Sequence, residues 1–177
     1  MTADETVPDR ARAHARPVAG RKLPGGRVAD RLSRRSADLV GLLDAQPPGS
    51  AVDPRTVRSH ELLLVTFRRN GDRVATPVWA ATADGVVYVR TQRASGKVKR
   101  LRRNGNVLLA PCGPRGVPRC APVAGRARLL PAAEEPVAER ALRARYGPVR
   151  ALCARIQDLL RVDMCYLAVT VEPGEPR

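Results

Sequence analysis

YVRTQRASGKVKRLRR, residues Tyr88–Arg103, is the most informative stretch of this sequence. It begins as a β-rich run, passes through a short polar turn, and continues from Ser95 as a basic amphipathic helix. Backbone N–H groups at the start of a helix bind phosphate, and the helix dipole adds to this attraction. Lys97 and Arg100 lie three residues apart and therefore share one face of the expected helix. The stretch predicts a pocket for a phosphate-bearing ligand.

The residues before and within this stretch predict an antiparallel meander. Three strands are expected, Glu61–Arg68, Arg73–Thr82 and Val86–Thr91. Asn70-Gly71 and Asp84-Gly85 lie between them, and both pairs are strong hairpin signals. Pro77 indicates an edge or a bulge in the second strand, because proline cannot donate to a strand ladder.

The residues after the basic helix predict further strands and two helices. The expected strands are Val107–Pro111, Pro118–Leu130 and Met164–Val171, and the expected helices are Glu134–Tyr146 and Val149–Leu160. Gly125 breaks the second of these strands, and Gly147 ends the first helix. Six strands with inserted helices predict a small antiparallel barrel of mainly β class with added α-helices.

Residues 1–52 differ in composition from the rest of the chain. They are rich in Pro, Arg and Ala and hold no aromatic residue. Asp30–Leu43 favours a short amphipathic helix, but the surrounding residues offer too little apolar surface to offset their chain entropy. We expect a mostly disordered arm at 1–52 without stable packing. One folded domain is expected at 53–177, with Asp53-Pro54 opening a helical turn.

The charge of the chain first suggests a nucleic-acid partner, with a net charge of +15 and a pI of about 11.2. Only three of the 32 basic residues are lysine, which is typical of a GC-rich genome, and aromatic residues make up only 3%. Because single-strand binders stack bases on aromatic side chains, nucleic-acid binding is disfavoured. Two of the three lysines, Lys97 and Lys99, fall in the predicted phosphate pocket, where a compact ammonium suits phosphate.

Several classes of protein and site are not supported by the sequence. No apolar run is long enough for a membrane span, and the first 30 residues hold no secretory h-region. The four cysteines and two histidines show neither a CxxC pair nor zinc spacing, so we expect reduced thiols, a cytoplasmic location and no metal site. No Ser-His-Asp, Cys-His or paired-carboxylate arrangement is visible, so no side chain is assigned as catalytic.

Seven motifs in order, LLLVTFRRNG, ATPVWAA, VYVRT, SGKVKRLRRN, VLLAPC, GRARLL and RYG, resemble the actinobacterial deazaflavin-dependent oxidoreductases of the pyridoxamine 5′-phosphate oxidase-like superfamily. The resemblance covers roughly residues 58–173, and the arm before residue 53 has no counterpart in the family. It implies a split β-barrel, usually a homodimer with two cofactor sites at the subunit interface. It also implies binding of coenzyme F420 or, in some branches, FMN.

The resemblance implies contacts for particular residues. The cofactor phosphate is expected at Thr91, Ser95, Gly96 and Lys97. The deazaflavin ring is expected against Thr76, Pro77, Val78 and Trp79, largely through backbone groups. Arg100 is expected to meet acidic parts of the cofactor, and Cys112 and Arg115 lie in a turn that could come from the other subunit. Many relatives carry an acidic residue where Ala94 stands here. Trp79 follows Thr-Pro in a strand, which favours a place in the cofactor wall over one in the core.

The function expected from these features is hydride transfer between reduced F420 and a small organic acceptor. Residues 90–103 carry seven basic side chains and no acid, which suits the carboxylates of the F420 tail and favours F420 over FMN. A deazaflavin carries the hydride, so the protein binds, orients and excludes water. Three alternatives remain: an FMN-dependent oxidoreductase of the same fold, a cofactor-binding protein without turnover, and a nucleic-acid binder that uses the basic arm and helix.

Overall fold

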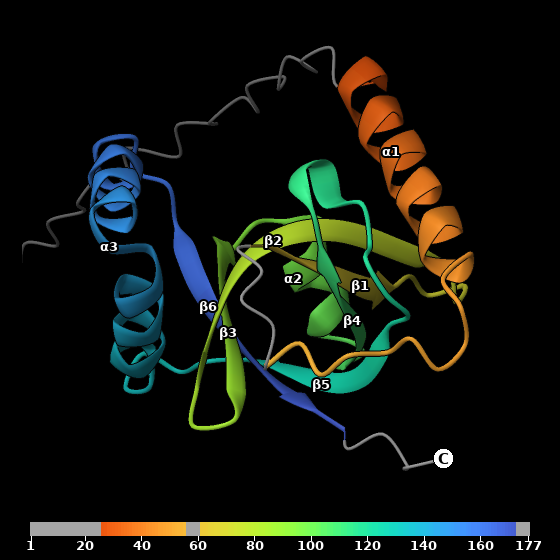
Figure 1. The fold of residues 1–177 in the computed structure, drawn as a ribbon. Coiled ribbons are helices and arrows are strands. Elements are labelled where there is room, and N and C mark those ends of the chain that lie inside the picture. Colours follow the sequence, from red (N-terminus) through yellow and green to blue (C-terminus); the bar gives the residue numbers. More distant parts are fainter. Residues whose placement is uncertain (1–25, 56–60, 173–177) are drawn as a thin grey trace, which may run out of the picture.

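The computed structural model describes residues 26–55 and 61–172 of this chain. Six antiparallel strands close into a barrel in the order β1-β2-β3-β6-β5-β4 (Figure 1). The strands are β1 Glu61–Phe67, β2 Arg73–Ala83, β3 Val86–Gln92, β4 Asn106–Cys112, β5 Val123–Leu129 and β6 Met164–Val171. The antiparallel barrel expected from the sequence is therefore confirmed.

The two hairpin turns have the backbone that their sequences favour. Gly71 has a φ of +87°, and Asp84 and Gly85 have φ values of +50° and +74°. Glycine and short polar residues adopt this left-handed region at low cost, and it matches the twist of the flanking strands. The β1-β2-β3 meander is thus set by local sequence.

Gly125 does not break β5, so the sequence prediction of a break there is wrong. β5 runs from Val123 to Leu129 and pairs with both β4 and β6. A Cβ atom at Gly125 would lie 2.7 Å from the carbonyl oxygen of Thr170 on β6. Glycine is needed here because two backbones approach closely.

The barrel interior is filled by alternate residues of all six strands. The interior core comprises Leu62, Leu64, Val78, Ala80, Val87, Val89, Leu101, Val107, Leu109, Ala127, Leu167, Val169 and Val171. Leu101 belongs to α2 (Gly96–Leu101), where Val98 is also fully buried, so this short helix packs into the barrel. α2 confirms the helix expected after Ser95, although it ends two residues before Arg103.

A helix before the barrel, α1 (Gly26–Asp44), packs against the barrel's outer surface (Figure 1). Leu39 and Leu43 of α1 are buried against a group of apolar residues on β1, β2 and β4: Leu63, Val65, Ala75, Ala110 and Cys112. Asp44 forms an ion pair with Arg73 at 2.6 Å. We expected no stable packing through residue 52, and this prediction is wrong for α1. The apolar stripe of α1 packs on an outer face of the barrel, which the sequence pattern of the arm did not indicate. Residues 1–25 lie outside the described residues.

The long helix α3 (Glu135–Leu159) lies on the side of the barrel opposite α1 (Figure 1). It is kinked at Gly147, with φ +51° and ψ −131°, and Pro148 follows, in agreement with the two helices expected on either side of Gly147. Ala138 and Leu142 in its first half pack against outward-facing residues of β3 and β6. Within residues 26–55 and 61–172, no helix is long and apolar enough to cross a membrane.

The packing of α1 can be tested with two neighbouring leucines. Leu43 is 1% exposed and Leu42 is 44% exposed. We expect Leu43→Ala to lower the free energy of unfolding by about 2–5 kcal/mol, because it leaves a cavity between α1 and the barrel. Leu42→Ala is the matched control and should change stability by less than about 0.5 kcal/mol. Urea unfolding measures both, and equal effects would mean that α1 does not pack on the barrel.

Candidate functional site

A cavity lies where β2 and β3 part. Their pairing extends only from Ala83↔Val86 to Ala80↔Val89. Beyond this point β2 continues against β1, whereas β3 continues against β6. The cavity has a volume of about 320 Å³ and is lined by Pro77, Val78, Trp79, Arg90, Thr91, Lys97 and Gln157. Five of these seven are residues that the sequence analysis assigned to a cofactor site.

The cavity has an inner and an outer end, because successive side chains of a strand point to opposite faces. Val78 and Thr91 are in phase with the strand residues of the interior core. The remaining strand residues of the lining are out of phase and belong to the outer surface: Pro77, Trp79 and Arg90. Lys97 comes from α2 at the inner end, and Gln157 comes from α3 at the outer end.

Two partly buried cations lie on α2, and one of them, Lys97, lines the inner end of the cavity. Lys97 Nζ donates a hydrogen bond to Thr91 Oγ1 at 3.0 Å, and Arg100 Nε donates one to Thr66 Oγ1 at 2.7 Å. Burial lowers the pKa of Lys97, and the nearby Arg100 charge lowers it further. Among the described residues, neither cation forms an ion pair with a carboxylate. A pair of desolvated cations with only hydroxyl partners favours an anion nearby.

Ser95 provides a further donor at the start of α2. It is the residue before the first helical position, but its hydroxyl makes no capping hydrogen bond. The Oγ atom is buried and has no hydrogen-bond partner within the described part of the chain. A Cβ atom at Gly96 would lie 3.0 Å from Arg100 Nη1, so the guanidinium lies close to this backbone. Because α2 has only six residues, its dipole is small, and the donors that could meet an anion here are mainly side chains.

Arg90 and Gln157 form the outer end and were missed by the sequence analysis. The Arg90 guanidinium lies over the Tyr166 ring, 5.7 Å from its centroid, and its Nη1 donates to Gln157 Oε1. Arg90 Nε is buried and has no hydrogen-bond partner in the described structure. Arg90 precedes the predicted site residue Thr91 on β3, so the alternation of side chains along the strand was a sequence signal for Arg90 on the other face. No local signal indicates Gln157, because its position depends on how α3 packs and bends at Gly147.

Trp79 forms part of the outer wall and is not a core residue. It is 40% exposed, and its ring stacks on Tyr146 at a centroid distance of 5.1 Å and an interplanar angle of 16°. The Tyr146 hydroxyl donates to the Ala80 carbonyl oxygen at 2.9 Å and accepts from the Ala80 N–H at 3.0 Å. The indole is therefore held flat against α3 beside the cavity.

The lining of the cavity does not include six of the predicted residues: Thr76, Ser95, Gly96, Arg100, Cys112 and Arg115. Thr76 is half-buried on β2 opposite Leu64. Cys112 is 2% exposed beneath α1, and burial raises the pKa of its thiol to about 12. Arg115 is exposed in the turn Pro114–Gly116, where its carbonyl oxygen accepts a hydrogen bond from Arg35 at 3.1 Å. The contribution of Cys112 and Arg115 to a second subunit's site stays a prediction, and so does the contact of Thr76 with the ring.

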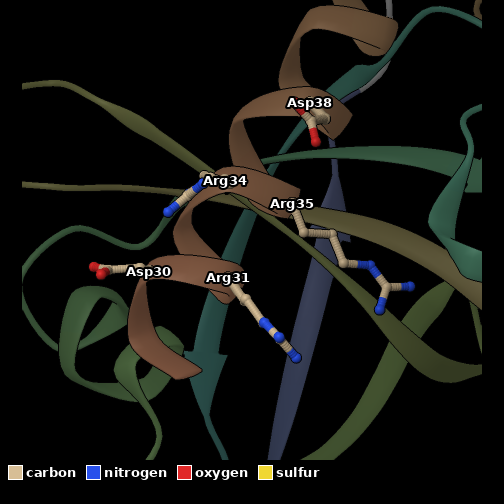
Figure 2. A pocket seen from close by; sticks show the side chains of 5 residues that line it. All are labelled: Asp30, Arg31, Arg34, Arg35 and Asp38. Carbon is tan, nitrogen blue, oxygen red and sulfur yellow. The ribbon is translucent and has the colours of Figure 1, made fainter. Parts of the chain in front are cut away.

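A second hollow of about 450 Å³ lies on α1 (Figure 2). Its lining consists of Asp30, Arg31, Arg34, Arg35 and Asp38. All five side chains are exposed and come from one helix, and the three arginines lie between the two aspartates along it. No partnerless buried polar atom is found among these residues, in contrast to the cavity between β2 and β3.

Lys97→Met tests the electrostatics of the inner end. We expect the unliganded variant to be at least as stable as the wild type, since methionine keeps the apolar stem and removes a disfavoured charge. Because the folded-state pKa of Lys97 is lowered, the unfolded chain binds more protons between that pKa and the ordinary lysine value. Wild-type stability should therefore rise with pH across this window, and the variant should lack the rise.

The measurement is urea unfolding at several alkaline pH values, with the exposed Lys99→Met as the matched control. The control should keep the wild-type pH dependence. A loss of more than about 1 kcal/mol in Lys97→Met would mean that the hydrogen bond to Thr91 outweighs the desolvation of the ammonium.

Comparison with known proteins supports the fold. No protein-family model matches the sequence, and no curated protein matches it. The chain is similar to the solved structure of HutZ, a heme storage protein from Vibrio cholerae, with 11% identity and a TM-score of 0.51 over 78% of this chain and 90% of that one. It is also similar to the conserved hypothetical protein Rv2991 from Mycobacterium tuberculosis, with 19% identity and a TM-score of 0.50 over 72% and 86%.

A structure described as an F420 reductase has 18% identity and a TM-score of 0.47, covering 72% of this chain and 96% of that one. At these identities the similarities speak to the fold alone. The strand order of the barrel, the separation of β2 from β3 and the similarity to HutZ and Rv2991 all indicate the same fold. The chain has a split antiparallel β-barrel, the fold class that its motifs implied, and it shares this fold with these two structures.

Proposed function

We propose that this protein binds coenzyme F420 at the parting of β2 and β3 and transfers a hydride between the reduced cofactor and a small organic acceptor. The observation that carries the proposal is a single cavity with an apolar wall and an uncompensated cationic end. Pro77, Val78 and Trp79 form the wall, and Lys97 supplies the cation. A flat, partly apolar ligand with a phosphate group matches both parts.

Residues at the start of α2, beside the inner end of the cavity, fit a phosphate. Lys97 Nζ and the partnerless Ser95 Oγ are both donors, and Thr91 holds the ammonium in place. A phosphate oxygen would accept charge-assisted hydrogen bonds from such donors and would favour the charged form of Lys97. The buried hydroxyl of Ser95 would then gain the partner that it lacks in the described structure.

The backbone of β2 fits a ring that carries amide-like groups. From Arg73 to Trp79, β2 has β1 on one side, and its pairing with β3 begins only at Ala80. Backbone N–H and C=O groups on the open side favour a hydrogen-bonding ligand, because buried backbone groups need partners. This supports the expectation that residues 76–79 contact a deazaflavin ring largely through the backbone.

A basic cluster near α2 favours F420 over FMN. Arg68 and Arg103 lie close enough to Arg100 to lower its pKa, although burial is the larger cause. F420 extends beyond a cavity of about 320 Å³, and its tail carries carboxylates, which FMN lacks. The cluster of Arg68, Arg100 and Arg103 suits those carboxylates.

The bound deazaflavin would supply the hydride chemistry. The chain would hold the phosphate end with Lys97 and Ser95 and keep the ring against the Trp79 wall. Trp79 itself is braced by Tyr146. Positioning and water exclusion are then the contribution of the protein, and no side chain is assigned as an acid or base.

A titration with F420 tests the proposal, followed by quenching of the single tryptophan, Trp79. We expect Lys97→Ala to weaken binding by about one to two powers of ten, because a charge-assisted hydrogen bond contributes about 1.5–3 kcal/mol. Arg102→Ala, which removes an exposed charge at the end of α2, should change the affinity little. Equal losses in both variants would favour a diffuse polyanion-binding surface and argue against a phosphate site.

Parallel titration with FMN distinguishes the two cofactors. Arg103→Ala should weaken F420 and leave FMN unaffected, because only F420 has carboxylates to meet the basic cluster. Tight binding of FMN with weak binding of F420 would favour the FMN-dependent alternative. Binding of reduced F420 without its oxidation by any of a panel of unsaturated acceptors would favour a carrier protein.

The proposal includes a homodimer. The apolar strands β4 and β6 are largely buried within their own chain and leave little surface for a partner. Exposed apolar side chains instead gather on the second half of α3: Val149, Leu152, Ile156 and Leu159. Their spacing places them on one helix face, and Gln157 of the same half-helix lines the cavity. A second copy on this face would lie near the candidate site.

Sedimentation at micromolar concentration tests the dimer. We expect wild type to sediment as a dimer and the double variant Leu152→Asp, Leu159→Asp as a monomer, because charges disfavour burial of the apolar face. Leu32→Asp on α1 is the control, since Leu32 is also exposed, at 63%, and should leave the dimer intact. A monomeric wild type with cofactor bound would end the proposal of a dimer.

A further inference from the structure

We infer that the outer end of the cavity, formed by Arg90 and Gln157, binds the carboxylate of the acceptor substrate. This inference rests on the proposed function, which assigns the inner end to the cofactor phosphate. It narrows the unknown acceptor to a class: a flat, apolar or unsaturated molecule that carries a carboxylate.

The first argument is the unsatisfied state of Arg90. Its Nε is buried and lacks a hydrogen-bond partner, while its Nη1 donates to Gln157. A buried donor without an acceptor is unfavourable, so the folded chain holds a site that a ligand acceptor would satisfy. Arg90 is absent from the ion pairs of the described residues, which leaves its charge available to an anion.

The second argument is the geometry around the guanidinium. The Tyr166 ring lies 5.7 Å below it, and the Gln157 amide holds one of its edges. These contacts restrict the orientation of the Arg90 guanidinium, whose planar set of N–H donors matches the two oxygens of a carboxylate. The amide nitrogen of Gln157 offers a further donor.

The third argument is the separation of the two cationic ends. Arg90 and Thr91 are adjacent in β3, so their side chains leave the strand on opposite faces. Lys97, bonded to Thr91, therefore lies at the inner end, and Arg90 at the outer end. Pro77 and Trp79 lie on the outer side with Arg90 and offer apolar surface to the rest of the acceptor. Two anionic groups can thus be held at once, one at each end.

Binding of benzoate and of its neutral analogue benzamide to the unliganded protein tests the inference, with Trp79 fluorescence as the signal. Wild type should bind benzoate about tenfold more tightly than benzamide, as one charge-assisted hydrogen bond provides. Arg90→Gln should abolish this preference. Gln157→Glu should abolish it too, because the new carboxylate would occupy the Arg90 guanidinium while preserving the size of the side chain.

Two control variants make the test specific. Arg126→Gln removes an exposed arginine on β5, and it should keep the preference for benzoate. Lys97→Ala should also keep it, while losing affinity for F420. Equal binding of benzoate and benzamide by wild type, or a preference that persists in Gln157→Glu, would overturn the inference.

Titration of the same variants with F420 separates this inference from the proposed function. If Arg90→Gln weakens F420 as strongly as it weakens benzoate, Arg90 belongs to the cofactor site and the inference is wrong, although the proposed function stands. If wild type fails to bind F420 but keeps the Arg90-dependent preference for benzoate, the proposed function is wrong and the carboxylate site stands.

Discussion

The structure depends on the point at which β2 and β3 separate, at the Ala80↔Val89 pair. Beyond it each strand keeps a partner on its other side, so the barrel stays closed in its strand order while one seam opens. The alternation of side chains then directs different residues to the two sides of the opening. A cavity through the sheet follows from this arrangement without any break in the core, and α2 packs Leu101 into the interior beside it.

The open seam and α2 beside it concentrate positive charge that no carboxylate among the described residues neutralises. Lys97 and Arg100 contact hydroxyl groups, and Arg90 contacts an amide, whereas ion pairs elsewhere join exposed residues such as Arg73 and Asp44. Desolvated cations with neutral partners are unfavourable for the unliganded fold. Buried charges without a partner of opposite charge are typical of binding sites, where a ligand supplies the missing charge. The same feature explains why both ends of the cavity favour anions.

The two flanking helices keep the barrel folded around this seam. α1 covers the outer faces of β1, β2 and β4 through Leu39 and Leu43, and the first half of α3 covers β3 and β6 through Ala138 and Leu142. Tyr146 then ties α3 to the backbone of Ala80, the last β2 residue before the seam. The end of the pairing and the position of Trp79 are thus fixed by one tyrosine.

The sequence alone determined the features that depend on neighbouring residues. Asn70-Gly71 and Asp84-Gly85 specified the hairpins, Ser95-Gly96-Lys97 specified the start of α2, and the motif resemblance indicated five of the residues that line the cavity. Only the tertiary structure decided the docking of α1, the continuity of β5 through Gly125 and the meeting of Arg90 with Gln157. The physical reason is separation along the sequence. Backbone preference and strand alternation act over a few residues, whereas these contacts join segments far apart in the chain. Such contacts form only when the closed barrel brings the segments together.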